Sequence, residues 1–340
     1  MHNEIDYLDL SFEFAQQAPF TTLLYNQRLP DFSDAEFQTL LTVLMSALEE
    51  NKSVSQVHLD WSFLRILQAQ EQEILLRRIG GLPRLQGVSI SGSTANVSHQ
   101  HISVFNFMRV VGAKMQTLTM DAMGSLKLQD FTYVEHFSDA LLQTASTLQI
   151  LRLENLQLPQ EPPNFPALDH LMDSLTICSS LEEVHLSVSL PRQYRRIAQP
   201  LVNVETLGRL VRPTIIRLYN FGLKPEHGLK LLNLPNIATL DLWNNFLDVD
   251  ETTTLSYRRA LCRQMNLREF RGVHDGIIDR YLFLNRCGRS SAGDSWSQTF
   301  DYWAAISVAG AREERRAARG DETNVTLDAL YTAIRDQPPL

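Results

Sequence analysis

The hydrophobic positions of the chain follow a pattern that recurs along its length. In LQILRLENLQL, residues 148–158, short alternation of apolar residues gives way to a looser spacing, whereas an isolated strand would have kept its alternation. The starts of similar apolar-x-x-apolar-x-apolar segments lie 24 to 34 residues apart, about 31 on average, which indicates an internal repeat. The segments begin at Phe20, Val54, Leu85, Met115, Leu148, Leu181, Pro213, Ile237 and Leu267.

Helical patterns separate these segments. Ser33 and Glu36 have the spacing of a capping box, and the apolar residues after them lie on one helical face over 37–48. Each repeat is therefore expected to contain a strand, a turn, a helix and a return loop. Similar apolar spacing predicts further helices over 69–79, 130–146, 166–178 and, in shortened form, 226–232.

Alternating strands and helices are also typical of a doubly wound sheet, so alternation alone does not separate the two architectures. Three features favour the repeat: the strand segments resemble one another, asparagine recurs at their eighth position (Asn155, Asn220 and Asn244), and no glycine-rich phosphate loop follows any of them. With these motifs the chain resembles the leucine-rich-repeat family, in particular its ribonuclease-inhibitor-like type, over residues 20–275.

This resemblance implies an α/β solenoid, or horseshoe, of about nine strand–helix repeats with a parallel sheet on its concave side and helices on its convex side. We expect an N-terminal cap over 1–19, the repeats over 20–275, and a C-terminal cap with a helical tail over 276–340. The apolar segment 277–289 would begin the C-terminal cap, because an open solenoid end needs cover.

The recurring asparagine has a role that the resemblance implies. In the family this side chain hydrogen-bonds the turn backbones of neighbouring repeats. Only three of the nine copies carry it here, so the asparagine ladder is expected to be irregular.

Side chains of such strands alternate between the core and the exposed face of the sheet. If Leu151 and Leu153 point inward, then Ile150, Arg152 and Glu154 point outward. The same register predicts three outward rows, which in the last five copies contain large, charged or aromatic residues. In those copies the rows read Ile150, Glu183, Ile215, Thr239 and Glu269; Arg152, His185, Arg217, Asp241 and Arg271; and Glu154, Ser187, Tyr219, Trp243 and Val273. Trp, Tyr and Arg are enriched at binding hot spots. The candidate partner-binding residues are Arg152, His185, Arg217, Tyr219, Asp241, Trp243 and Arg271.

An alternative interpretation of this set is an inert polar surface. Arg152 with Glu154 and Arg217 with Asp241 would then be surface ion pairs, each worth at most about 1 kcal/mol. An exposed Trp243 is harder to explain in this way, unless the C-terminal tail folds over it.

The composition narrows the classes of function. The formal net charge of −8 argues against a general nucleic-acid or anionic-membrane binder. Cys178, Cys262 and Cys287 are too scattered for a disulfide framework or a metal motif, and Cys178 is expected in the core. The acidic N-terminus does not have the pattern of a secretory signal, and no apolar run is long enough to span a membrane. We therefore expect a cytoplasmic or nuclear protein.

Other polar residues give weaker signals of chemistry. His99 and His101 have a spacing that can bind metal, but no third ligand is evident nearby. His58 and Asp60 would share an outward strand face, yet no nucleophile motif accompanies them. We expect no metal site, no cofactor and no catalytic residues.

The prediction from these observations is a monomeric intracellular scaffold, not an enzyme, that binds a protein partner on the concave face. One alternative is a GTPase activator, because one activator family has the same repeat type, although the mixed charge of the C-terminal tail differs from the acidic tail of those proteins. Another is a substrate adaptor for a ubiquitin ligase, although no F-box-like segment precedes Phe20. Fold analogy does not choose among these functions.

Overall fold

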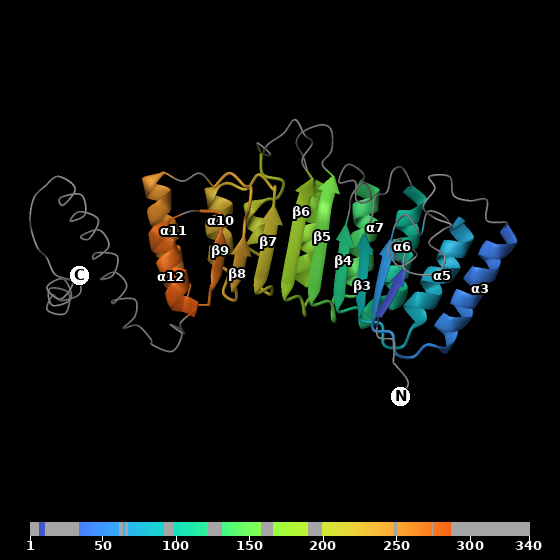
Figure 1. Cartoon of the computed structure of the whole chain (residues 1–340). Helices are drawn as coiled ribbons and strands as arrows, with labels where there is room; N and C mark the ends of the chain where they lie inside the picture. Colours follow the sequence, from blue (N-terminus) through green and yellow to red (C-terminus); the bar gives the residue numbers. More distant parts are fainter. Residues whose placement is uncertain are drawn as a thin grey trace, which may run out of the picture.

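Strands and helices alternate along the chain (Figure 1). The computed structural model describes residues 7–10, 34–60, 64, 67–91, 98–121, 131–157, 166–189, 199–247, 250–264, 266–273 and 275–286. The strands are β1 (Tyr7–Leu10), β2 (Gln56–Asp60), β3 (Gly87–Ser91), β4 (Thr117–Asp121), β5 (Ile150–Gln157), β6 (Glu183–Ser189), β7 (Ile215–Tyr219), β8 (Thr239–Asp241) and β9 (Glu269–Arg271). The helices are α3 (Asp34–Glu50), α5 (Ala69–Gly81), α6 (Ser98–Val111), the 3-10 helix η1 (Gly112–Lys114), α7 (Phe131–Leu142), α8 (Pro166–Ile177), α9 (Val204–Leu207), α10 (Pro225–Leu232), α11 (Glu251–Arg263) and α12 (Gly276–Arg286).

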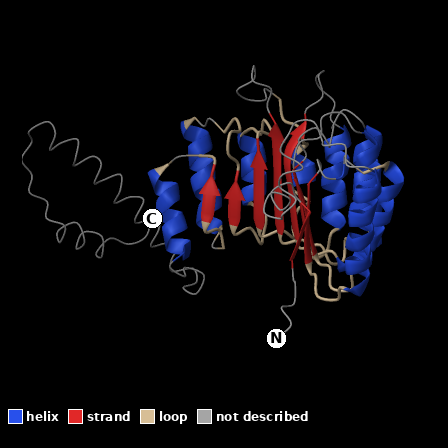
Figure 2. Ribbon diagram, turned by 45° about the vertical axis from the view of Figure 1, so that its right-hand side comes forward, coloured by secondary structure: helices blue, strands red, loops and turns tan. Residues whose placement is uncertain are grey.

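The strands form a single parallel sheet in which spatial order follows sequence order, β1 to β9. Eight of these strands, β2–β9, are the ones predicted from Val54 onward, and their parallel direction is confirmed. Right-handed crossovers between adjacent parallel strands put the connecting helices on one side of a sheet. Figures 1 and 2 show the helices behind the sheet and at its ends. We call the other side the open face; it carries His58, Ser89, Thr119, Arg152, His185, Arg217, Asp241 and Arg271.

The hydrophobic core lies between the sheet and the helix layer. The inward residues of the two longest strands, Leu151, Leu153, Val184 and Leu186, are all fully buried. Burial of each such aliphatic side chain contributes about 1.5–3 kcal/mol. Cys178 is buried in the same core, as expected, and burial raises the pKa of its thiol to about 11. The buried residues of these strands therefore alternate with residues that point to the open face, as the sequence predicted.

The helix predictions agree with the structure. The helices predicted over 37–48, 69–79, 130–146 and 166–178 correspond to α3, α5, α7 and α8. The shortened helix predicted over 226–232 is α10, which has eight residues. Helices α9 and α11 were not predicted; α9 is a single turn whose N-cap is the Asn203 side chain, which accepts a hydrogen bond from the Glu205 amide.

The N-terminal edge of the sheet differs from the prediction. The first strand was expected to begin at Phe20, within the first repeat, but the strand that pairs with β2 is Tyr7–Leu10, inside the range expected to be a cap. Tyr7 pairs with Gln56 and Leu10 with Leu59, so YLDL has the same inward and outward alternation as the other strands. The segment from Phe20 lies outside the described residues.

The three asparagines at the eighth position share a backbone conformation. Asn155, Asn220 and Asn244 have φ of 56°, 63° and 58°, in the left-handed region that asparagine tolerates better than most residues. The Asn155 Nδ2 donates to Asp121 Oδ1 at 3.0 Å, and the Asn220 Nδ2 donates to the Val188 carbonyl at 2.7 Å, so both also link to the preceding repeat.

The most extensive turn-backbone contacts come from the next position. Asn245 is buried, and its Oδ1 accepts hydrogen bonds from the Phe221 and Leu223 amides at 2.9 and 3.1 Å. Its Nδ2 donates to the carbonyls of Leu218 and Leu242 at 2.7 and 2.9 Å. In the copy that begins at Ile237, the ninth residue therefore takes up the ladder role that the resemblance implied for the eighth; the ninth residues of the other two asparagine copies, Leu156 and Phe221, are buried apolar side chains.

An apolar helix, α12, lies at the start of the range that was predicted to be a C-terminal cap. Ile278, Tyr281 and Leu282 of α12 are buried, and α12 packs against α11. Arg258 of α11 forms a two-pronged ion pair with Asp275, with its Nη2 2.6 Å from Oδ2 and its Nε 3.2 Å from Oδ1. The rest of the predicted cap and tail, from Cys287 onward, lies outside the described residues.

Candidate functional site

The open face brings five of the seven candidate residues into one row across five adjacent strands. Arg152 pairs in register with His185, His185 with Arg217, Arg217 with Asp241, and Asp241 with Arg271. Adjacent strands are about 4.8 Å apart, so neighbours in this row are within side-chain reach. We call these five residues the arginine row. The register that the sequence predicted for β2–β9 is confirmed.

A nearly buried glutamate holds the first two arginines of the row. Glu183 is 7% exposed, and its Oε1 accepts from Arg152 Nε at 3.0 Å and from Arg217 Nη1 at 2.6 Å. Arg–carboxylate bonds of this kind are shorter and stronger than neutral hydrogen bonds. Glu183 thus fixes two guanidinium groups on either side of His185.

Sequence reasoning placed Glu183 in an outward row but did not assign it to the site. Its strand neighbours at the same level are Ile150 and Ile215, which offer it no counter-charge. Diagonal neighbours in the predicted register could have identified Glu183 as part of the site. Arg152 and Arg217 each lie two positions beyond the residue that pairs with Glu183, and long side chains can reach across such a diagonal.

A second nearly buried carboxylate organises the other end of the row. Asp241 is 5% exposed, and its Oδ2 accepts a hydrogen bond from the Tyr219 hydroxyl at 2.9 Å. The Arg271 Nη1 lies 3.6 Å from the same oxygen, and the Trp243 amide donates to Oδ1 at 3.2 Å. One carboxylate therefore orients a tyrosine, an arginine and the backbone that carries the tryptophan.

These contacts correct the expected ion pairs. Arg152 and Arg217 both bind Glu183, rather than Glu154 and Asp241 respectively. Asp241 was expected to face solvent with the other members of its row and is buried instead, because Tyr219 and Arg271 contact it. Val273 was also expected outward and is buried; it follows Gly272, whose φ of 150° interrupts the strand alternation.

Three aromatic rings stand side by side on β6, β7 and the turn after β8. The His185 and Tyr219 centroids are 4.8 Å apart and the Tyr219 and Trp243 centroids 6.0 Å apart, both in edge-to-face arrangements. Such pairs are worth about 0.5–1.5 kcal/mol beyond the area that they bury. Trp243 ends the series and remains 61% exposed, which makes it the most exposed aromatic ring of the seven candidates.

The surroundings of His185 favour its neutral form. Burial lowers the pKa of its imidazole, and the nearby Arg217 and Arg152 guanidinium groups add to this effect, while Glu154 and Glu183 oppose it. Within the described part of the chain, the His185 Nε2 is buried and has no hydrogen-bond partner. An unsatisfied buried nitrogen costs stability. The edge-to-face contact of the His185 ring with Tyr219 offsets part of that cost.

Tyr219 is also shifted from its ordinary behaviour. Burial, and then its hydrogen bond to Asp241, raise the pKa of the Tyr219 phenol to about 12. The hydroxyl therefore stays protonated at neutral pH and donates its hydrogen bond to Asp241.

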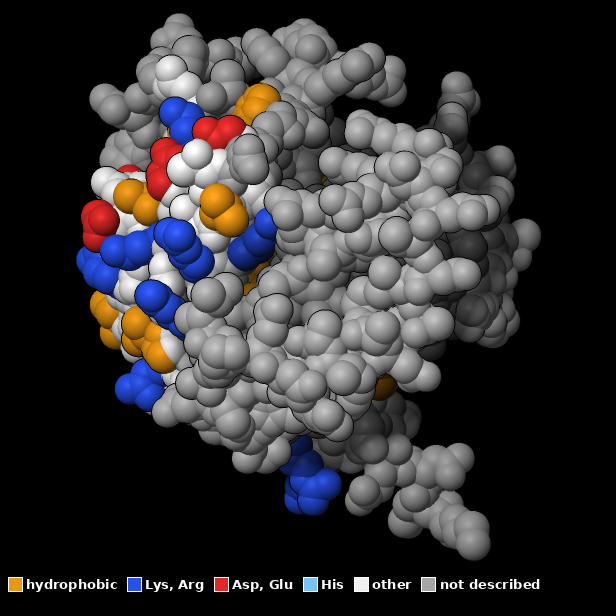
Figure 3. Space-filling model, turned by 90° about the vertical axis from the view of Figure 1, so that its left-hand side faces the viewer, with side chains coloured by type: hydrophobic (Ala, Val, Ile, Leu, Met, Phe, Trp, Pro, Cys, Tyr) orange, Lys and Arg blue, Asp and Glu red, His pale blue; other side chains and the backbone are white. Residues whose placement is uncertain are grey.

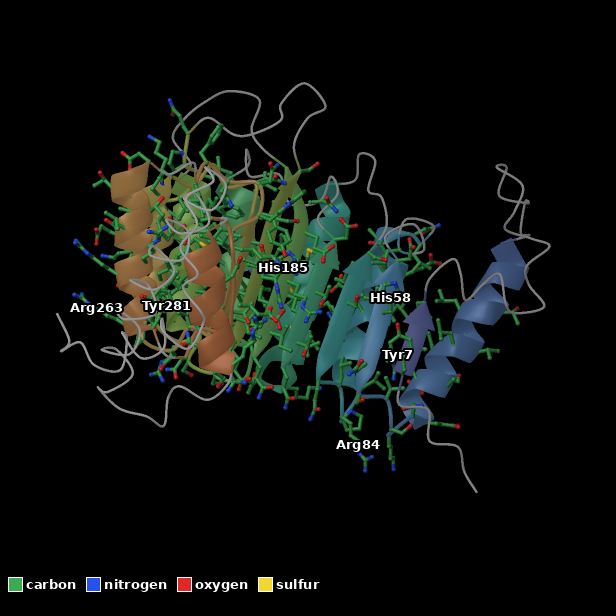
Figure 4. The ribbon with its side chains drawn as sticks, turned by 60° about the vertical axis from the view of Figure 1, so that its left-hand side comes forward. Tyr7, His58, Arg84, His185, Arg263 and Tyr281 are labelled. Carbon is green, nitrogen blue, oxygen red and sulfur yellow. The ribbon has the colours of Figure 1, made fainter. Side chains whose placement is uncertain are left out.

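The N-terminal half of the open face has a different character. His58 contacts two serine hydroxyls, with its Nδ1 3.1 Å from Ser89 Oγ and its Nε2 3.1 Å from Ser91 Oγ. The residues level with His58 on β3 and β4, Ser89 and Thr119, have short side chains. His58 and Asp60 do share one strand face, and the contacts of His58 are those of a hydrogen-bonded surface histidine. Figure 4 shows His58 and His185 on the same sheet, over its N-terminal and central strands.

The remaining candidates do not form a site in the described residues. His99 and His101 lie in the first turn of α6. Within the described ranges, no group of three His, Cys, Asp or Glu side chains is arranged to hold a metal ion. None of the helices in those ranges combines the length and apolar character that crossing a membrane requires.

The comparisons with known proteins do not assign the chain to a family. No protein-family model matches the sequence, and no curated protein shows significant similarity to it. The repeated strand–helix units and the chemistry of the open face are therefore the grounds for any functional conclusion.

Proposed function

We propose that the chain is a leucine-rich-repeat solenoid of the ribonuclease-inhibitor-like type, with the open face on its concave side. The near-constant repeat length, one strand and one helix per repeat, and the left-handed asparagines at the eighth position support this assignment. Because each unit contacts mainly its neighbours, such a fold presents a long continuous sheet face to other molecules.

On this basis the protein acts as an intracellular protein-binding scaffold, and the arginine row with Tyr219 and Trp243 is its contact surface. The observation that carries the proposal is Trp243, which is 61% exposed although Tyr219 stands beside it and Asp241 fixes its backbone. An aromatic ring held in this way loses little freedom when a partner covers it, so most of its burial contributes to affinity.

The size of the face fits this role. Nine strands spaced about 4.8 Å apart span about 40 Å, which is enough for the roughly 800 Å² per partner of a standard interface. The small side chains of β3 and β4 would leave room for a protruding element of the partner, and β5–β8 would supply the contacts.

The test is a quantitative affinity capture from the native cell extract with the full chain. The variant Arg217→Ala/Tyr219→Ala/Trp243→Ala is compared with wild type and with a control, Arg77→Ala/Leu142→Ala/Ile177→Ala. The control removes an arginine and two large apolar side chains from helices α5, α7 and α8, and Ile177 on α8 is as exposed as Trp243, at 61%. Circular dichroism and urea unfolding establish that each variant is folded.

We expect the site variant to lose specific proteins that wild type and the control both retain. Chemical crosslinking should then join a retained protein to the open face. If the site variant and wild type capture the same proteins while the control loses them, binding belongs to the helix layer and the assignment of this surface is wrong.

A further inference from the structure

The charges of the candidate surface lie at two different depths. The Arg152, Arg217 and Arg271 side chains are 42%, 28% and 74% exposed, whereas those of Glu183 and Asp241 are 9% and 7% exposed. The carboxylates thus lie beneath the guanidinium groups. A molecule that approaches the arginine row meets its guanidinium groups before the two carboxylates beneath them, although the protein as a whole has a formal charge of −8. Glu154 on β5 and Glu269 on β9 also point outward and lie in the rows on either side of the arginine row.

The arginines keep hydrogen-bonding capacity for a partner. A guanidinium group has five N–H donors in a fixed plane. The contacts with Glu183 use Nε of Arg152 and Nη1 of Arg217, each bonded to the same carboxylate oxygen. The remaining donors of these groups are held in position by that contact and match carboxylate geometry.

An apolar contact stands next to these donors. Trp243 follows β8, between Tyr219 on β7 and Arg271 on β9, so its exposed ring adjoins the end of the arginine row. A ligand that satisfies both features must carry negative charge and an apolar side chain within a few residues of each other.

We propose that the segment recognised by the open face is an acidic peptide with an apolar or aromatic residue beside its carboxylates. The carboxylates bind Arg152, Arg217 and Arg271, and the apolar side chain packs on Trp243. This inference rests on the proposed protein-binding function and names the class of partner surface.

A peptide fits this face better than a nucleic acid does. The outward row next to the arginine row carries Asp60, Asp121 and Glu154 on β2, β4 and β5. A phosphate backbone that continued along the sheet would pass over these carboxylates and be repelled. A short acidic peptide can instead place its few carboxylates on the arginine row itself.

The C-terminal part of the described chain also carries a small excess of positive charge, which would attract an acidic segment. Between residues 199 and 286 the sequence contains twelve Lys and Arg against nine Asp and Glu. Figure 3, which views this end of the molecule, shows basic side chains gathered with hydrophobic ones among them. A positive field at this end would steer an acidic segment toward the arginine row at low salt.

The experiment selects binders from a random 12-residue peptide library displayed on phage, with the full chain as bait. Enriched peptides are synthesised with a fluorophore, and their dissociation constants are measured by fluorescence anisotropy. Two controls are measured beside them: a charge-reversed peptide, in which Lys replaces each Asp and Glu, and a 12-nucleotide single-stranded oligonucleotide.

The principal variant is Arg152→Gln/Glu183→Gln/Arg217→Gln. It removes the two cations together with the carboxylate that they bind, so no buried charge is left unpaired. Its matched control is Arg77→Gln/Glu73→Gln/Arg84→Gln, which likewise removes two arginines and one glutamate, including the Arg77–Glu73 ion pair on α5. Arg271→Gln is a second site variant, which tests an exposed arginine at the edge strand.

We expect enriched peptides to be acidic and to contain an aromatic or large aliphatic residue. Their affinity should fall about tenfold or more in the principal variant and remain within about twofold in the control. It should also fall severalfold between about 50 and 300 mM salt, because the arginines are partly exposed.

Other outcomes separate the inference from the proposed function. If enriched peptides are neutral or basic but lose binding when Trp243 is changed to Ala, the face binds peptides and the acidic class is wrong. If the oligonucleotide binds more tightly than any peptide, the protein-binding function fails as well. If no sequence is enriched, an acidic peptide is not the ligand, and a folded partner captured by the extract experiment would still support the proposed function.

Discussion

His58 and His185 occupy the same row of the same sheet face, and yet their environments differ. Both lie at the third residue of a strand, β2 and β6, in equivalent register. The two ring nitrogens of His58 contact the hydroxyls of Ser89 and Ser91. His185 instead lies between two arginines, packs on Tyr219, and has a buried Nε2 without a partner among the described residues.

The difference shows where the chemistry of this face originates. The backbone position is the same for both histidines, so the side chains on the neighbouring strands decide the outcome. On β3, beside His58, these neighbours are the short hydroxyl side chains of Ser89 and Ser91, which contact its two ring nitrogens. On β5 and β7, beside His185, they are arginines tied to Glu183; burial lowers the pKa of His185, and these arginines add to the effect.

Removing the arginines on either side of His185 should change its environment most. In Arg152→Ala/Arg217→Ala, Glu183 becomes a nearly buried charge without a counter-ion, and we expect the free energy of unfolding to fall by about 3 kcal/mol. Urea denaturation followed by circular dichroism measures this. Adding Glu183→Gln should restore most of the loss; a loss below about 1 kcal/mol in the double variant would mean that water solvates the carboxylate.

A smaller change sharpens the role of the second carboxylate. Tyr219→Phe removes the hydroxyl that donates to Asp241, and a hydrogen bond to a charged group is worth about 1.5 kcal/mol in such a test. Because burial and Asp241 raise the pKa of Tyr219 to about 12, the folded protein favours the neutral phenol.

The pH dependence of this pair follows from that shift. The stabilisation is present below the ordinary tyrosine pKa of about 10 and is lost as pH rises from about 10 to about 12. The difference in unfolding free energy between wild type and Tyr219→Phe should therefore shrink over this range. A difference that stays constant up to pH 11.5 would contradict the assigned hydrogen bond.

On the N-terminal side, Ser89→Ala/Ser91→Ala should cost about 1 kcal/mol, because it removes both partners of His58 while leaving the core unchanged. A double-mutant cycle with His58→Ala isolates the coupling between the histidine and the serines. If the cycle gives no coupling energy, water replaces the hydroxyls and the local satisfaction of His58 is not what stabilises this half.

The smallest effect concerns the protonation of His185. Burial and the two arginines lower its pKa, so the unfolded chain binds a proton more readily than the folded one, and stability is lost as pH falls through about 6.5. His185→Gln should weaken this acid-side loss, measured as the unfolding midpoint in urea between pH 7.5 and 5. Two-dimensional NMR of the wild-type imidazole should give a midpoint below 6.5; a midpoint above it would show that the glutamates dominate.

The repeat and the outward register are properties that the sequence determined by itself. Alternation is a local property of a strand, so Arg152 must point outward if Leu151 and Leu153 point inward. The repeat period can also be read from the sequence, and it aligns equivalent residues of neighbouring strands. The same reasoning put Arg152, His185, Arg217, Asp241 and Arg271 into one row, as observed.

Tertiary structure alone decided which strand begins the sheet. YLDL near the N-terminus and the segment from Phe20 both alternate, and local pattern does not rank them. The choice depends on pairing with β2, a contact distant in sequence, and Tyr7–Leu10 makes it.

Tertiary structure also decided which outward groups are buried and which partners they take. Local alternation says that Glu183 and Asp241 point to the open face, but not that arginines and a tyrosine from adjacent strands close over them. Long side chains choose among several charged neighbours at similar distances, and that choice depends on depth and geometry across strands. The repeat thus follows from the order of residues along the chain. The charge that the open face presents follows from the packing of side chains from neighbouring strands.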